Sequence, residues 1–119
     1  MATLEETIRG LREILADPDA PHWRWRLRRH LSLAREALAH DPDALRLSDG
    51  WLAARSGVNE RERRHLLARI VALGPRVLDR VQDDVAAEVR RLVTDLEHYQ
   101  QRAHDLVYDS VALELGGSE

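Results

Sequence analysis

The stretch VAAEVRRLVTDLEHYQQRAHDL, residues 85–106, places apolar side chains at alternating intervals of four and three residues. The positions are Val85, Val89, Leu92, Leu96, Tyr99, Ala103 and Leu106. Because an α-helix completes a turn about every 3.6 residues, this spacing places the apolar side chains on one face of the helix. We therefore predict a long core-facing helix, unbroken from near Pro75 to about Ala112, that ends before Gly116-Gly117.

Two earlier segments show the same helical period. The first begins at a capping box formed by Thr3 and Glu6 and stops before Pro18. Its apolar positions are Leu4, Ile8, Leu11 and Leu15. The second takes Pro21 into its first turn and ends at the His-Asp-Pro sequence of residues 40–42. Its apolar stripe is Trp23, Leu27, Leu31, Ala34 and Leu38.

A further helix is predicted in the middle of the chain. Asn59 and Glu62 form a second capping box, and the helix runs through Leu73 until Gly74-Pro75 interrupts or kinks it. Residues 43–58, just before it, read as one or two short helical pieces. The turn signals that punctuate them are Ser48-Asp49-Gly50 and Gly57.

The predicted fold is all-α. No useful length of sequence alternates with a period of two, and phenylalanine is absent, so strands are not expected. Four principal helices with short connections predict an antiparallel (up-and-down) four-helix bundle. Residues 43–58 form its short helical insertion, and residues 1–119 form a single domain.

Composition excludes several classes of protein. Cysteine is absent, which excludes disulfides, thiolate zinc sites and cysteine nucleophiles. No apolar run approaches the roughly 20 residues that span a bilayer, and the acidic N-terminus does not resemble a secretory signal. We therefore expect a cytoplasmic protein without membrane contact. No Ser/His/Asp grouping or phosphate-binding glycine loop indicates an enzyme.

All 18 basic residues are arginine, and their distribution is uneven. Residues 24–76 carry twelve arginines against six acids, whereas residues 1–23 and 77–119 are acidic. One interpretation is charge complementarity between neighbouring helices. The other is a basic face that binds an anionic partner.

Residues 23–29, WRWRLRR, interleave tryptophan with arginine. Trp23 and Leu27 share the core face of the predicted helix, so Trp25 points outward. Such a pattern binds nucleic acid or anionic membranes in some proteins. The simpler alternative is one exposed tryptophan stacked on Arg24 or Arg29. A second cluster of arginines, at residues 61–64, could also bind an anion. The candidates for partner or anion binding are Trp25, Arg24, Arg28, Arg29, Arg61 and Arg64.

Residues 52–66, LAARSGVNERERRHL, resemble a helix-turn-helix DNA reader with its turn at Gly57 and an arginine-rich second helix. Arg63 departs from the motif, because it stands where an apolar residue would pack against the first helix. A working reader would bury that charge without a partner. A DNA-binding regulator that uses residues 51–70 is therefore an alternative, and we predict no sequence-specific DNA binding.

Six histidines invite a metal hypothesis. Helical phase places His30 within reach of the interior and His104 at its boundary. His40, His65 and His98 lie away from their apolar stripes. The phase therefore predicts that few of these imidazoles face the core, where bundle metal sites are built.

The C-terminal segment QRAHDLVYD, residues 101–109, followed by Leu115-Gly116-Gly117, resembles the hemerythrin-like (HHE cation-binding) domains of small actinobacterial proteins. A looser match reaches back through residues 89–92, 64–66, 49–50 and 30–31, so the resemblance covers most of the chain after residue 22. It implies a four-helix bundle and, in functional members, a pair of non-haem irons.

The resemblance also implies which residues would bind iron. His30, His40 and His65 match histidines of the family pattern, but the histidine of the last helix falls on Tyr99, with His98 one step out of register. Ala44 stands where a carboxylate is expected one turn after His40. The iron site is therefore expected to be absent or incomplete.

We predict a non-enzymatic hemerythrin-like binding protein that recognises a protein partner or itself and needs no cofactor. The alternative is a non-haem iron protein that handles oxygen, nitric oxide or peroxide. Its ligand candidates are His30, His40, His65, His98, Tyr99, His104 and Asp105.

Overall fold

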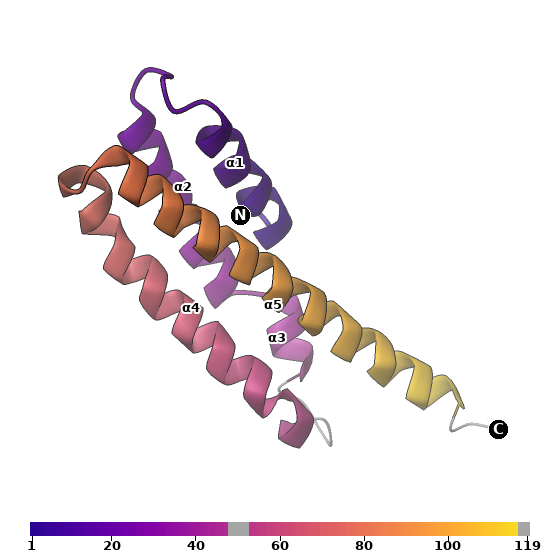
Figure 1. The fold of residues 1–119 in the computed structure, drawn as a ribbon. Coiled ribbons are helices and arrows are strands. Elements are labelled where there is room, and N and C mark those ends of the chain that lie inside the picture. Colours follow the sequence, from indigo (N-terminus) through magenta and orange to yellow (C-terminus); the bar gives the residue numbers. More distant parts are fainter. Residues whose placement is uncertain (48–52, 117–119) are drawn as a thin grey trace.

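The computed structural model describes residues 1–47 and 53–116, and Figure 1 shows their arrangement. Regular structure within these ranges is entirely α-helical, without a strand. The helices are α1 (Leu4–Ala16), α2 (Trp23–Ala39), α3 (Pro42–Leu47), α4 (Ala53–Asp79) and α5 (Gln82–Gly116). The all-α prediction is confirmed. The molecule is elongated, with extents of 58 × 22 × 21 Å.

One apolar core joins the four longer helices. α1 packs against α2 and α5, α4 packs against the same two helices, and short α3 contacts α5 and α4. The core contains the apolar stripes predicted for α1, α2 and α5. All residues of these stripes are buried except Leu106, which is partly buried. The helical phase deduced from the sequence is therefore correct for these three helices.

The ends of α1 and α2 are fixed by specific hydrogen bonds. The predicted capping box is present: Glu6 N donates to Thr3 Oγ1 at 3.1 Å, and Thr3 N donates to Glu6 Oε2 at 3.3 Å. Trp23 Nε1 donates to the carbonyl of Ile14 at 2.9 Å, which ties the start of α2 to the end of α1. Pro21 lies before α2 rather than in its first turn, because His22 adopts a left-handed conformation (φ 58°) at the N-cap.

Gly74-Pro75 does not interrupt the helix, so this one of the two predicted outcomes, interruption or kink, is wrong. α4 continues through both residues to Asp79, and α5 begins at Gln82 rather than near Pro75. Proline removes the hydrogen bond to the carbonyl four residues earlier, here that of Val71. Both Pro75 and Val71 are exposed, so water can satisfy this carbonyl, and Gly74 has no Cβ to clash with the proline ring. α5 is unbroken through Tyr99, as predicted, and extends to Gly116.

The predicted helix start at Asn59 is also wrong. Asn59 lies inside α4 and is buried, and Gly57 lies inside the same helix, where its Cα faces open space. Of the predicted insertion at 43–58, the first part is α3 and the last part belongs to α4. The turn signal at Ser48-Asp49-Gly50 lies outside the described residues.

Candidate functional site

His30 packs at the boundary between α1 and α2. Its ring lies so close to Gly10 that a Cβ added there would meet His30 Cδ2 at 2.6 Å. Its Nδ1 lies 3.0 Å from the carbonyl oxygen of Arg26, one turn earlier on α2. The imidazole is therefore held against the backbone of α1 and does not reach the centre of the core.

The other candidate metal ligands lie apart. His40, His65 and His98 are exposed, and His40 Nδ1 contacts the carbonyl oxygen of Glu36 at 3.0 Å. His104 is also exposed, and its Nε2 lies 2.9 Å from Asp43 Oδ2. Asp105 accepts a hydrogen bond from a neighbouring glutamine. Residues 1–47 and 53–116 contain no group of three or more metal-binding side chains, so they do not fit a dinuclear iron centre.

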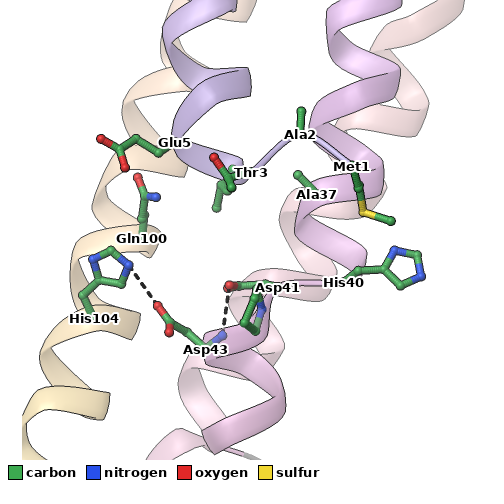
Figure 2. Close-up of a pocket in the computed structure, with 12 residues that line it drawn as sticks. Met1, Ala2, Thr3, Glu5, Ala37, His40, Asp41, Asp43, Gln100 and His104 are labelled. Carbon is green, nitrogen blue, oxygen red and sulfur yellow. Dashed lines mark hydrogen bonds and ion pairs between the residues drawn. The ribbon is translucent and has the colours of Figure 1, made fainter.

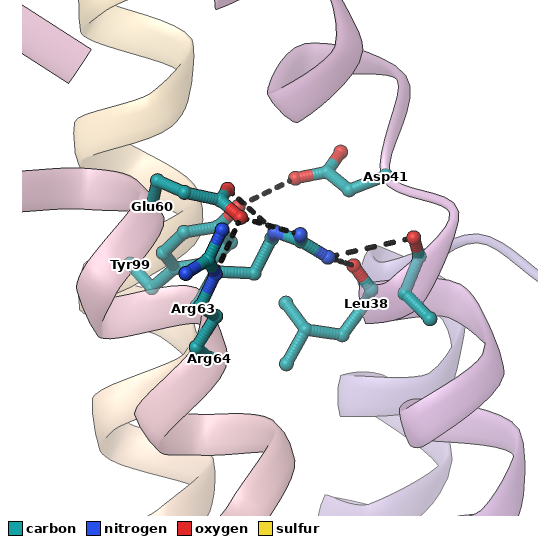
Figure 3. Close-up of polar contacts among 7 residues, drawn as sticks. Leu38, Asp41, Glu60, Arg63, Arg64 and Tyr99 are labelled. Atoms are coloured by element: carbon teal, nitrogen blue, oxygen red, sulfur yellow. Dashed lines mark hydrogen bonds and ion pairs between the residues drawn. The ribbon is translucent and has the colours of Figure 1, made fainter. Parts of the chain in front are cut away.

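The residue at the position of the family's last-helix histidine is a buried phenol. Tyr99 is fully buried, and its hydroxyl donates to Asp41 Oδ2 at 3.0 Å (Figure 3). Asp41 Oδ1 accepts from the backbone N–H of Asp43 at 3.2 Å. Asp41 is therefore the N-cap of α3, with Pro42 at the favoured first helical position. One carboxylate thus links the start of α3 to the middle of α5.

Arg63 and Glu60 lie beside this pair (Figure 3). Arg63 donates from Nε to Glu60 Oε2 at 2.9 Å and from Nη2 to Oε1 at 2.7 Å. Its Nη1 donates to the carbonyls of Leu38 and Ala39 at 3.2 and 3.4 Å. A cation at a helix C-terminus is favourable because the terminal carbonyls carry partial negative charge. Arg63 is the residue that departs from the helix-turn-helix motif. In this structure it caps the C-terminal end of α2.

The electrostatics of this cluster favour a structural role. Burial raises the pKa of Tyr99, and the neighbouring carboxylate of Asp41 raises it further, so the phenol stays neutral. Burial also raises the pKa of Asp41, although the Tyr99 hydroxyl opposes this effect. The hydrogen bond from Arg63 lowers the pKa of Glu60. A neutral phenol that donates to a carboxylate is a poor iron ligand and a stable hydrogen-bond donor.

A hollow near the cluster lies where α1 begins, beside the α2–α3 junction and α5. Figure 2 shows this cavity of about 410 Å³, which is lined by Glu5, Asp41, Asp43, Gln100 and His104, among others. The Asp43–His104 contact closes one side. Sequence analysis missed Asp41, because a polar residue before proline at a helix end is typical of an exposed turn.

The outer face of α2 is basic. Trp25 is 61% exposed, and Arg26, Arg28 and Arg29 are exposed around it. Among the residues that the structure describes, none of these three arginines makes an ion pair or a side-chain hydrogen bond. Arg24 instead turns inward, and its Nη1 donates to the carbonyls of Val77 at 2.6 Å and Arg80 at 2.8 Å. We call Trp25, Arg26, Arg28 and Arg29 the Trp25 face.

Other arginines join neighbouring helices. Ion pairs connect Arg12 with Glu97, Arg69 with Asp95, Arg76 with Glu88, and Arg102 with Glu62. Arg69–Asp95 and Arg76–Glu88 join the basic stretch 24–76 to the acidic segment 77–119, so the interpretation of charge complementarity between helices is confirmed for these two pairs. Of the α4 candidates for anion binding, Arg64 pairs with Glu60 at 3.2 Å, and Arg61 is exposed.

No known protein family, curated protein or solved structure matches this chain. The hemerythrin-like resemblance therefore rests on the quoted residues and stays a prediction. No helix in the described ranges has the length and apolar character needed to cross a membrane. The straight course of α4 from Ala53 also leaves no turn at Gly57, which the helix-turn-helix interpretation requires.

Proposed function

We propose that this chain is a non-enzymatic helical-bundle protein that binds a protein partner through the Trp25 face. The proposed fold is the up-and-down four-helix bundle formed by α1, α2, α4 and α5. Two register observations support it. Arg12 meets Glu97 while Glu5 lies near His104, so α1 and α5 run in opposite directions. Arg24 meets Val77 and Arg63 meets Leu38, so α2 and α4 do as well.

The observation that carries the functional proposal is the contrast between two groups of arginines. Arginines on α1, α4 and α5 pair with carboxylates of adjacent helices, whereas the arginines of the Trp25 face have no such partner in the described part of the chain. Tryptophan and arginine are the residues most enriched among interface hot spots. An exposed indole surrounded by free guanidinium groups fits a surface that is apolar at its centre and acidic at its rim.

The test uses a photo-crosslinking amino acid at position 25, with the same amino acid at position 90 as control. Arg90 is also exposed, but it lies on α5 outside the Trp25 face. We expect a discrete adduct from position 25 and none from position 90. The protein identified in the adduct is then purified and titrated with the wild type, Trp25→Ala, Arg29→Glu and Arg90→Glu.

The expected result is a Kd that rises roughly thirtyfold for Trp25→Ala, since a hot-spot truncation costs about 2 kcal/mol or more. Arg29→Glu should weaken binding most at low salt, because exposed charges are screened as salt rises. Arg90→Glu should bind like the wild type. Unchanged affinity for both Trp25→Ala and Arg29→Glu would exclude the Trp25 face as the binding surface.

A further inference from the structure

An apolar groove lies between the N-terminal half of α4 and the C-terminal half of α5. It encloses about 310 Å³, and the apolar side chains of Val58 and Leu106 line it. This volume is at the lower limit of ligand pockets, roughly 300–1,000 Å³, and suits one large side chain. Val58 is 66% exposed, so the described residues leave this surface largely uncovered.

Asn59 gives the groove an unsatisfied acceptor. The residue is only 6% exposed and lines the groove, yet its Oδ1 makes no hydrogen bond. Buried polar atoms in folded proteins nearly always have a partner, so an exception needs an explanation. The oxygen is enclosed, so a donor in the groove would supply the missing hydrogen bond only if the Asn59 side chain turned toward the groove.

The rim of the groove is acidic. Glu62, Asp105 and Asp109 line it, and the single lining arginine, Arg102, pairs with Glu62. Asp105 accepts a hydrogen bond from uncharged Gln101 at 3.0 Å and has no ion pair among the described residues. A cationic surface with an apolar centre would therefore complement this groove.

We propose that the occupant is the Trp25 face of a second copy of this chain. This inference rests on the proposed function, and it names the partner. Trp25 supplies a large apolar side chain and an indole N–H that has no acceptor in residues 1–47 or 53–116, so it can donate to Asn59 Oδ1 once the Asn59 side chain turns toward the groove. Arg26, Arg28 and Arg29 bring positive charge to the acidic rim.

The two surfaces lie at opposite ends of the molecule. Arg24 contacts Val77 and Arg80, which places the start of α2 beside the α4–α5 connection. The groove lies at the other end of these helices, toward the C-terminus in Figure 1. A contact between different patches of identical copies is heterologous and does not need to close. A pair of bound copies still offers one free groove on one copy and one free Trp25 face on the other, so copies add in a row.

The test is sedimentation equilibrium over a concentration series with three variants of the whole chain. Trp25→Ala removes the inserted side chain, and Asp105→Arg combined with Asp109→Arg reverses the rim. Arg90→Glu is the control outside both surfaces. These residues are exposed, so the variants should fold, and far-ultraviolet dichroism checks this.

We expect the average mass of the wild type and of Arg90→Glu to rise with concentration, and each interface variant alone to stay monomeric. An equimolar mixture of Trp25→Ala with the Asp105→Arg/Asp109→Arg variant should form a 1:1 dimer and nothing larger. The first variant keeps its groove and the second keeps its Trp25 face, so one contact forms. Asn59→Leu should weaken association roughly two- to tenfold relative to the wild type, because it removes one hydrogen bond across the contact.

A wild type that stays monomeric up to about 1 mM, the weakest Kd such a series detects, would overturn the inference. So would a mixture that forms no dimer. If position 25 nevertheless crosslinks to a different protein whose binding depends on Trp25, the proposed function stands and only the second copy is excluded as partner.

Discussion

Removal of the Tyr99 hydroxyl tests the buried cluster directly. Tyr99→Phe keeps the ring and its packing but deprives Asp41 Oδ2 of its donor. Asp41 is 8% exposed, so water cannot fully replace the lost hydrogen bond. A hydrogen bond to a charged group contributes about 1.5–3 kcal/mol, and we expect the free energy of unfolding to fall by that amount at neutral pH.

The pH dependence of this loss follows from the pKa of Asp41. Burial raises that pKa above its ordinary value of 3.8, so the folded protein holds the proton more tightly than the unfolded chain. The stability from this group is therefore fully present below pH 3.8 and is lost as the pH rises through the folded-state pKa. The Tyr99 hydroxyl stabilises the charged carboxylate, so its removal raises the pKa further.

The cost of Tyr99→Phe should therefore be largest at neutral pH. In acid it should shrink toward that of a neutral hydrogen bond, about 0.5–1.5 kcal/mol. Urea denaturation at several pH values measures both quantities. Tyr108→Phe is the matched control, because Tyr108 is 74% exposed and should lose less than about 0.5 kcal/mol. If the two variants lose the same stability, or if the loss at Tyr99 does not change with pH, the role assigned to Asp41 is wrong.

Three further predictions concern packing and metal. Leu96→Ala should lower the free energy of unfolding by about 2–5 kcal/mol, because it is a large-to-small change in the core. His98→Ala should change it by less than about 0.5 kcal/mol. If urea denaturation gives the reverse order, the helical phase of α5 is misassigned. Gly10→Ala should cost about 1–3 kcal/mol by forcing the His30 ring aside, and combining it with His30→Ala should recover most of that loss in a double-mutant cycle. Protein expressed with added iron should contain well under one iron per chain by elemental analysis, and a content near two per chain would instead favour the alternative of a functional non-haem iron protein.

The parts of the fold that sequence predicted correctly depend on periodic burial. The stripe from Val85 to Ala103 recurs at a helical period, and each of its residues is buried. The prediction of a helix from such a pattern depends on many residues, so one exception does not change it. The capping box at Thr3 and Glu6 was equally predictable, because its partners are three residues apart.

The errors came from local signals whose meaning depends on the surroundings. Gly74-Pro75 is typical of a helix end, but here α4 continues through both residues, on a side of the helix where Val71 and Pro75 are exposed. Asn59 is typical of an N-cap, but α4 begins earlier and buries it. Asp41 reads as a turn residue, and only the fold reveals its partner Tyr99, 58 positions further along the chain.

The position of α5 between α1 and α4 has a consequence for synthesis on the ribosome. α1 and α2 precede α5 in the chain, so the apolar side of α1 that faces α5 stays uncovered until α5 emerges from the ribosome. The 35 residues of α5 take about 2–7 s to translate at typical rates of about 5–20 residues per second. A chain that stops before residue 82 lacks α5 and keeps this side of α1 uncovered, so we expect such a truncated chain to bind chaperones.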